Sequence, residues 1–245
     1  MKLIVDLGNT NIKLGLFKAN KLAKVFTFST NNYRSKELIK FVPSIKHLSI
    51  KEAYVGSVVP SLNKKIINEI KKTLNINAVL ITPQMFSCIF NLKRFNLNEI
   101  GVDILGYACL LKQRFKKAVG FSYGTATFAV AVNNEEIIGV VIAPAIDEGM
   151  NHLSKSTEMI SFKKQSNLLI KANFGGNTNA ALNAGSYHMA NGFLQSAFSY
   201  CQKHYKINRA CISGGKIKNI ALTKNKNIQV IENVILLGYN ELLIK

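Results

Sequence analysis

The sequence predicts an α/β protein built from two similar halves, residues 1–115 and 116–245, with a central cleft. The main observation is a near repeat: residues 3–17 read LIVDLGNTNIKLGLF, and residues 118–132 read AVGFSYGTATFAVAV. Each segment contains an apolar strand, a polar turn centred on glycine and a second apolar strand. In both halves, further strands then alternate with amphipathic stretches of helical period, which is the order of elements in α/β proteins.

The turns of the two repeats predict a nucleotide site. When the repeats are aligned, Gly8 falls on Gly124 and Asp6 falls on Ser122. Glycine lets the backbone approach a ligand closely, so that backbone N–H groups and nearby hydroxyls can contact a phosphate. We therefore expect a nucleotide to be held between the halves, and we expect the turns to differ in chemistry because a carboxylate in one is a hydroxyl in the other.

The remaining elements follow from β-branched content, alternation and helical spacing. In the first half we expect strands at 3–5, 12–17, 22–28, 53–59 and 78–81, and helices at 35–42, 62–74 and 101–116. In the second half we expect strands at 118–121, 127–132, 137–143, 210–213 and 229–231, and helices at 148–159, 177–204 and 236–245. Each half thus has three antiparallel strands followed by helices and parallel strands.

Composition excludes several classes of protein. Nearly half of the 245 residues are hydrophobic, and no apolar run reaches the ~20 residues that a membrane span needs. The N-terminus lacks the pattern of a signal peptide, and four cysteines without CxxC spacing indicate reduced thiols, so we expect a cytoplasmic protein. The net charge of +19 comes almost entirely from scattered lysines, which favours compositional drift over a nucleic-acid site.

The segment Asp6-Leu-Gly8-Asn9-Thr10 is the first candidate for chemistry. Its glycine permits close approach, Asn9 and Thr10 can donate hydrogen bonds to phosphate oxygens, and the carboxylate can hold Mg²⁺. A plain hairpin turn uses the same residue types, so both interpretations stay open.

Two further segments that contain glycine each have a structural and a functional interpretation. Asp103, which follows Gly101-Val102 at the start of a predicted helix, is either an N-terminal cap or first-turn acid that stabilises the helix, or a general base. Gly214-Gly215 is either a backbone platform for an adenine ring or a turn into a helix.

Thr178, after Gly175-Gly176-Asn177, either caps the following helix or reaches a ligand. The four histidines show no metal-ligand spacing, and we interpret them as structural or surface residues.

Taken in order, these segments resemble the type III pantothenate kinases of the acetate kinase/sugar kinase/Hsp70/actin superfamily. The resemblance runs through residues 6–10, 55–60, 101–103, 122–126, 139–144, 175–178, 213–215 and 237–238, and therefore covers the whole chain. It implies two ribonuclease H-like halves and ATP-dependent phosphorylation of pantothenate to 4'-phosphopantothenate, the first step of coenzyme A biosynthesis. It also implies a homodimer that uses Mg²⁺ and a monovalent cation, K⁺ or NH₄⁺.

The resemblance implies roles for individual residues. Asp103 would be the catalytic base that accepts the proton of the pantothenate hydroxyl. The residues implied to face ATP are Asp6, Gly8, Asn9, Thr10, Lys13, Thr125, Gly214 and Gly215, and those implied to bind pantothenate are Gly101, Val102, Ile104 and Thr178. Asp6 would also face Mg²⁺, and Ser122 occupies the position of the family's monovalent-cation ligand.

Three positions differ from the family pattern. Ile104 stands where the family has arginine, Ser122 where it has aspartate, and Ala145 where it has glycine after Pro144. A hydroxyl is a weaker ligand for K⁺ than a carboxylate is. These differences leave a second hypothesis open: a catalytically weakened or non-catalytic homologue that acts as a regulatory or partner subunit. A third hypothesis is another small-molecule kinase of the same superfamily. Retention of both Asp6 and Asp103 favours the kinase.

Overall fold

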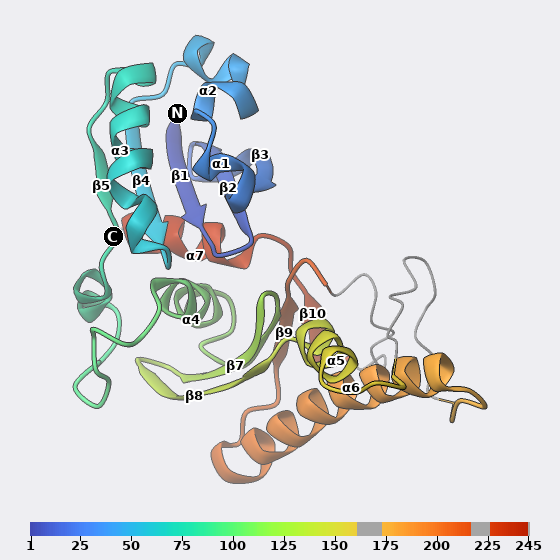
Figure 1. Ribbon diagram of the computed structural model, residues 1–245. Helices are drawn as coiled ribbons and strands as arrows, with labels where there is room; N and C mark the ends of the chain where they lie inside the picture. Colours follow the sequence, from blue (N-terminus) through green and yellow to red (C-terminus); the bar gives the residue numbers. More distant parts are fainter. Residues whose placement is uncertain (161–172, 217–225, 245) are drawn as a thin grey trace. The chain divides into compact units, whose positions relative to one another are not determined.

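The computed structural model describes residues 1–160, 173–216 and 226–244. They form two compact units, the first from the described parts of 1–114, 135–137 and 233–245, and the second from those of 115–134 and 138–232. Each unit contains one five-stranded sheet with helices packed against it (Figure 1).

The sheet of the first unit has the strand order β3-β2-β1-β4-β5. Its strands are β1 (Lys2–Leu7), β2 (Asn11–Lys18), β3 (Lys21–Ser29), β4 (Glu52–Ser57) and β5 (Ala78–Leu80). The first three strands are antiparallel and are joined by short turns, whereas β4 pairs parallel with both β1 and β5. A parallel pair needs a crossover, and the chain between β3 and β4 supplies it with α1 (Thr30–Arg34), α2 (Leu38–Phe41) and the 3₁₀-helix η1 (Pro43–His47).

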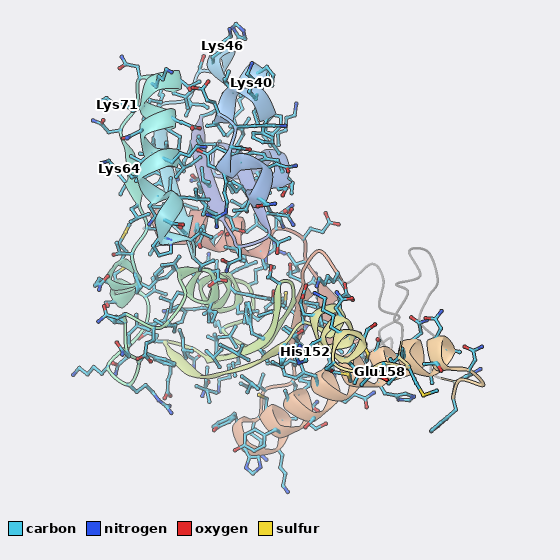
Figure 2. All side chains as sticks on the ribbon, viewed as in Figure 1. Lys40, Lys46, Lys64, Lys71, His152 and Glu158 are labelled. Carbon is cyan, nitrogen blue, oxygen red and sulfur yellow. The ribbon has the colours of Figure 1, made fainter. Side chains whose placement is uncertain are left out.

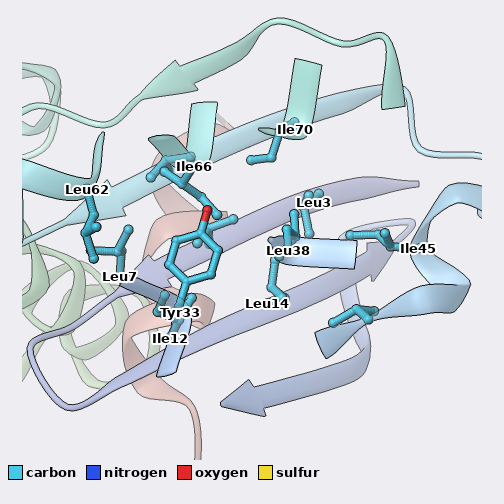
Figure 3. Close-up of a cluster of buried hydrophobic side chains, with 14 of the residues drawn as sticks. Leu3, Leu7, Ile12, Leu14, Tyr33, Leu38, Ile45, Leu62, Ile66 and Ile70 are labelled. Atoms are coloured by element: carbon cyan, nitrogen blue, oxygen red, sulfur yellow. The ribbon is translucent and has the colours of Figure 1, made fainter. Parts of the chain in front are cut away.

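One face of this sheet forms the main hydrophobic core of the unit. Successive strand residues point to opposite faces, and the odd-numbered residues Leu3, Val5 and Leu7 of β1 all point to this one. Helix α3 (Pro60–Leu74) covers the face with a stripe of residues that includes Ile66 and Ile70 (Figure 3). The buried Tyr33 of α1 joins this cluster, and its hydroxyl donates a hydrogen bond of 2.8 Å to Glu69 of α3.

The opposite face of the sheet contacts α7 (Val234–Leu243), near the C-terminus. A side chain added at Gly15 of β2 would meet Leu236 of α7, and the Lys2 ammonium donates to the Asn240 side chain at 3.4 Å. Lys2, Asp6 and Gly15 all point to this face because they alternate with the core residues. Therefore Asp6, the only acid of β1, lies on the α7 side of the sheet.

The sheet of the second unit repeats the topology of the first, with the order β10-β9-β6-β7-β8. Its strands are β6 (Lys117–Tyr123), β7 (Ala126–Asn133), β8 (Glu136–Pro144), β9 (Ala210–Ser213) and β10 (Ile228–Val230). Strands β6 and β7 are antiparallel, and β9 pairs parallel with β6 and β10. Helix α6 (Thr178–Tyr205) packs on β6 and β7 through Ala190, Leu194 and Phe198, and α5 (Ile146–Lys155) packs on α6.

These observations confirm the predicted fold class, an α/β fold of two ribonuclease H-like halves, because the same strand order occurs twice. The predicted hairpins at 3–17 and 118–132 are both present. Their turns differ in length: Asp6 pairs with Lys13, whereas the aligned Ser122 pairs with Phe128, so the second turn is one residue shorter. The domain boundary at 115/116 and the central cleft stay predictions, although α7 belongs to the first compact unit.

Several predicted helices have different bounds in the structure. The helix expected at 35–42 is replaced by α1 and α2, because the Ser29 hydroxyl accepts from the backbone N–H of Asn32 and starts a helix earlier. Helix α4 spans Val102–Phe115, and a second 3₁₀-helix, η2, spans Pro83–Cys88. Helix α5 starts and stops earlier in the chain than the helix predicted at 148–159, although the two ranges overlap. Helix α7 starts earlier than the helix predicted at 236–245, of which residue 245 lies outside the described part.

The positive charge is spread over the surface. Exposed lysines occur on several helical elements: Lys40 on α2, Lys46 on η1, and Lys64 and Lys71 on α3 (Figure 2). In the described part of the chain, no helix combines the length and the apolar character that crossing a bilayer requires.

Candidate active site

The turn between β1 and β2 is held by the start of α1. The backbone N–H of Gly8 donates to the Asn11 carbonyl at 3.1 Å, which closes the turn. The Thr30 hydroxyl donates to the Gly8 carbonyl at 2.7 Å, and the Thr30 backbone N–H donates to the Thr10 carbonyl at 3.0 Å. These bonds fix the loop carbonyls toward α1, while Asn9 and Thr10 remain exposed. The loop therefore presents polar side chains to solvent from a fixed backbone.

Asp6 and Lys13 lie side by side on the α7 face of the sheet, because they are paired in the antiparallel register of β1 and β2. Both side chains are half-buried. The Lys13 ammonium donates to the Asn233 side chain at 3.4 Å, and Asn233 is the residue that precedes α7, in a left-handed backbone conformation. The start of α7 thus holds the one lysine that lies beside Asp6 in the sheet register.

Asp103 lies in the first turn of α4 (Val102–Phe115). Its carboxylate turns back along the helix and accepts a hydrogen bond of 2.9 Å from the backbone N–H of Ile104. A side chain at Gly101 would collide with Asp103 Oδ1, so this glycine provides the space for the carboxylate. The carboxylate has further acceptor positions besides the one used by the backbone, so it can also accept a proton.

The two carboxylates influence each other. Burial and, to a smaller extent, the negative charge of Asp103 raise the pKa of Asp6 to about 7, against the opposing effect of the Lys13 ammonium. Burial also raises the pKa of Asp103, and the hydrogen bond from Ile104 opposes that shift. Two acids whose ionisation is disfavoured in one small region attract a cation, and they are the type of pair found at catalytic sites.

Tyr239 of α7 completes this group, and the sequence offers no signal for it. The side chain is fully buried, and a Cβ atom at Gly106 of α4 would lie 2.7 Å from its Cε1 atom. A side chain at Gly56 of β4 would overlap the ring as well. Gly56 is the partner of Asp6 in the parallel register of β1 and β4, and Gly106 follows Asp103 by about one helical turn. The tyrosine therefore lies beside both acids.

The structure places the other predicted residues of the first unit at the edges of this group. Gly8, Asn9 and Thr10 follow directly after β1, which carries Asp6. The side chains of Val102 and Ile104 are buried, so they form part of the interior at the start of α4.

The second unit brings together another subset of the predicted residues. Ser122 of β6 pairs with Ser213 of β9 in parallel register, and both serines are buried. Gly214 follows with φ of 126°, and a side chain there would overlap the Tyr123 backbone, so only glycine fits this turn. Gly215 continues the turn, and Lys216 N–H donates to the Tyr123 carbonyl at 3.2 Å.

Thr125 and Thr178 are exposed. Thr125 lies in the turn between β6 and β7, and Thr178 is the first residue of α6. The cap of α6 is Asn177, whose side chain accepts from the backbone N–H of Ala180 at 2.9 Å. The capping interpretation of Thr178 is therefore wrong, because the preceding asparagine takes that role.

The arrangement in the first unit suits transfer of a phosphoryl group. A carboxylate beside a lysine, next to a loop with exposed Asn and Thr, can hold a metal ion and phosphate oxygens. In the described part of the chain, no three acidic, histidine or cysteine residues cluster as a metal centre.

Comparisons with known proteins agree with this chemistry. The sequence model of the type III pantothenate kinase family matches residues 2–199. Proteins named type III pantothenate kinase are similar over nearly the whole length: that of Mycoplasma mobile is 29% identical, covering 98% of each chain, and that of Mycoplasmopsis synoviae is 27% identical, covering 98% of this chain and 94% of the other.

Among solved structures, that of a conserved Baf family protein from Campylobacter jejuni, named for transcriptional activation, matches with a TM-score of 0.66 and 15% identity. The match covers 99% of this chain and 97% of that one, and it shows the shared fold. The family match covers well over half of the residues, and the chain therefore belongs to the type III pantothenate kinase family.

Proposed function

We propose that this chain transfers the γ-phosphoryl group of ATP to the primary hydroxyl of pantothenate, forming 4'-phosphopantothenate in the first step of coenzyme A biosynthesis. The observation that carries the proposal is the pair Asp6 and Asp103 beside Lys13, in a chain that belongs to this family. The ATP that the reaction consumes agrees with the predicted cytoplasmic location.

Asp103 is the general base of the proposed reaction. As the pantothenate oxygen forms its bond to the γ-phosphorus, the bond from that phosphorus to the ADP oxygen breaks, and the hydroxyl proton passes to the Asp103 carboxylate. The raised pKa of Asp103 makes it a better proton acceptor near neutral pH than an ordinary aspartate. The backbone bond from Ile104 and the space at Gly101 hold the carboxylate in one orientation.

Asp6, Lys13 and the β1–β2 loop bind the nucleotide in this proposal. Mg²⁺, when bound, neutralises phosphate charge, and Asp6 is the residue that would hold it. The Lys13 ammonium compensates phosphate charge, and Gly8, Asn9 and Thr10 contact phosphate oxygens. Positioning and charge neutralisation of this kind supply most of the catalysis in phosphoryl transfer.

The remaining contacts come from both units. In the second unit, Thr125 and the Gly214-Gly215 turn face ATP, and Thr178 binds pantothenate. In the first unit, Gly101, Val102 and Ile104 at the start of α4 bind pantothenate. Ser122 and its neighbour Ser213 offer neutral oxygens to a monovalent cation, K⁺ or NH₄⁺. Neutral oxygens bind such an ion weakly in comparison with the family's carboxylate.

We also propose a homodimer that forms through the second unit. Val141 and Ile142 of the edge strand β8 are 54% and 65% exposed, and Tyr200 of α6 is 55% exposed. An apolar groove lined by residues of β7, β8 and α6 adjoins them. Exposed apolar surface next to an edge strand is typical of an interface.

The dimer is tested by light scattering after size-exclusion chromatography. The double variant V141E/I142E should elute as a monomer. Val79→Glu, which alters an exposed valine on the edge strand β5 of the first unit, is the matched control and should stay dimeric. A monomeric wild type, or a dimer that survives the double substitution, would contradict this interface.

The kinase function is tested by a coupled assay of ADP release, with pantothenate present or omitted and with K⁺ titrated. Release of ADP that requires pantothenate, together with detection of 4'-phosphopantothenate by mass spectrometry, is the expected result. ATP turnover that is the same without pantothenate would refute the proposed substrate.

A further inference from the structure

The Tyr239 hydroxyl is a buried polar group without a hydrogen bond. The side chain is fully buried in α7, and its oxygen has no hydrogen-bond partner among the described residues. An unpaired buried hydroxyl normally destabilises a protein, and phenylalanine would fill the same space without this cost. The hydroxyl is therefore expected to serve a purpose other than packing.

Three glycines fix the position of the ring. Gly56 and Gly106 lie against it, since a side chain at either residue would collide with the ring atoms. Gly238 allows α7 to approach the carbonyl of Gly106, which a side chain would overlap. The ring thus lies in a slot between β4 and α4 that only glycines leave open, and its hydroxyl has a defined place.

This place is next to Asp6 in the sheet. Gly56 and Asp6 are in register on neighbouring strands, so their side-chain positions lie on the same face about 4.8 Å apart. The Tyr239 hydroxyl lies against the position where a Gly56 side chain would begin. Lys13 occupies the equivalent position on the other side of Asp6. Across three strands, the order is therefore Lys13, Asp6 and the tyrosine hydroxyl.

We propose that Tyr239 is a positioning residue for Asp6: its hydroxyl donates a hydrogen bond through one water to the Asp6 carboxylate and holds it toward Mg²⁺ and the ATP phosphates. The inference rests on the proposed kinase function. An ionised carboxylate only accepts hydrogen bonds, and a tyrosine hydroxyl is a suitable donor.

The test compares Tyr239→Phe with Tyr33→Phe. Tyr33 is equally buried, but its hydroxyl donates to Glu69 of α3, in the core on the other face of the sheet. For Tyr239→Phe we expect an unchanged or raised melting temperature of the ligand-free protein. We also expect about a tenfold loss in kcat/KM for Mg·ATP and about a fivefold weaker Kd for Mg·ADP by calorimetry. KM for pantothenate should stay within twofold.

Tyr33→Phe should show the opposite behaviour, with a lower melting temperature, and with kinetic constants and Mg·ADP affinity within twofold of the wild type. If Tyr239→Phe leaves both Mg·ADP affinity and kcat/KM for Mg·ATP unchanged, the hydroxyl has no positioning role. A loss that appears mainly in KM for pantothenate would also overturn the inference, because it would assign the hydroxyl to the substrate.

The design separates this inference from the proposed function. If the wild type does not phosphorylate pantothenate, the proposed function fails, whereas the calorimetric comparison of Mg·ADP binding still decides the role of Tyr239. If the wild type binds no Mg·ADP, both are overturned.

Discussion

Replacing Asp6 by asparagine should stabilise the ligand-free protein at neutral and alkaline pH while removing its kinase activity. In the folded protein the pKa of Asp6 is about 7, against 3.8 for an ordinary aspartate, because of burial and the nearby Asp103. Between these two values the folded state binds a proton that the unfolded chain has released. Stability from this group is therefore present below pH 4 and is lost as pH rises to about 7.

The size of the effect follows from the shift. About three pKa units at ~1.36 kcal/mol each set a ceiling of about 4 kcal/mol. The Asp6 side chain is half-buried, so water screens part of this cost, and we expect a net gain of about 1–2 kcal/mol for Asp6→Asn at pH 8. In a protein of this length, that corresponds to a rise in melting temperature of roughly 2–8 °C.

The assay is thermal unfolding of the wild type and Asp6→Asn from pH 4 to pH 9 without nucleotide or Mg²⁺. The two curves should converge at the acid end, where the aspartate is protonated in both states, separate as pH rises from about 4 to 7, and keep a constant separation above pH 7. Glu37→Gln, at an exposed carboxylate of the first unit, controls for the loss of one negative charge. An Asp6→Asn curve that runs parallel to the wild type, or that lies below it at pH 8, would refute the reasoning.

Asp103→Asn should lower kcat by ~10²-fold or more while the melting temperature and ATP binding stay nearly unchanged, and activity within a few-fold of the wild type would show that Asp103 only stabilises the start of α4. Ser122→Asp should lower the K⁺ concentration needed for half-maximal rate or restore a K⁺ requirement. This expectation would be contradicted if the wild type already saturates at low K⁺ and the variant binds K⁺ no more tightly. Gly238→Ala should destabilise the protein by more than ~2 kcal/mol, because its Cβ would overlap the Gly106 carbonyl, whereas Gly192→Ala on the open surface of α6 should stabilise it by up to ~1 kcal/mol; equal melting temperatures would exclude the close approach.

The sheet elements could be predicted from sequence because their signals are local. The strands of each hairpin alternate in apolar character or are continuously apolar, and glycine marks each turn, so β1, β2, β6 and β7 fall close to their predicted places. The region after β3 was harder, since α1, α2 and η1 are each at most five residues long and have no period to detect. Contacts from α3 hold this region: the Glu69 carboxylate accepts from the backbone N–H of Leu38 at 2.7 Å.

The candidate site was predictable only in part. Asp6 and Asp103 stand in short motifs with glycine, and the sequence indicates both. Tyr239 lies near them only because three glycines from separate elements open a slot for its ring, and no spacing in the sequence reports such a tertiary feature. Thr178 illustrates a different difficulty, because the local signal for a helix cap fits two adjacent residues, Asn177 and Thr178. Only the backbone geometry decides between them.

The use of α7 by the first unit has a consequence for how the protein is made. The hairpin β1–β2 and the helix α4 leave the ribosome long before residues 233–244, yet the α7 face of their sheet stays uncovered until those residues arrive. Until then the buried ring slot is empty and Lys13 lacks its contact with Asn233. A nascent chain can therefore form the β1–β2 loop early, whereas Tyr239 can take its place beside Asp6 only after residues 233–244 have been made.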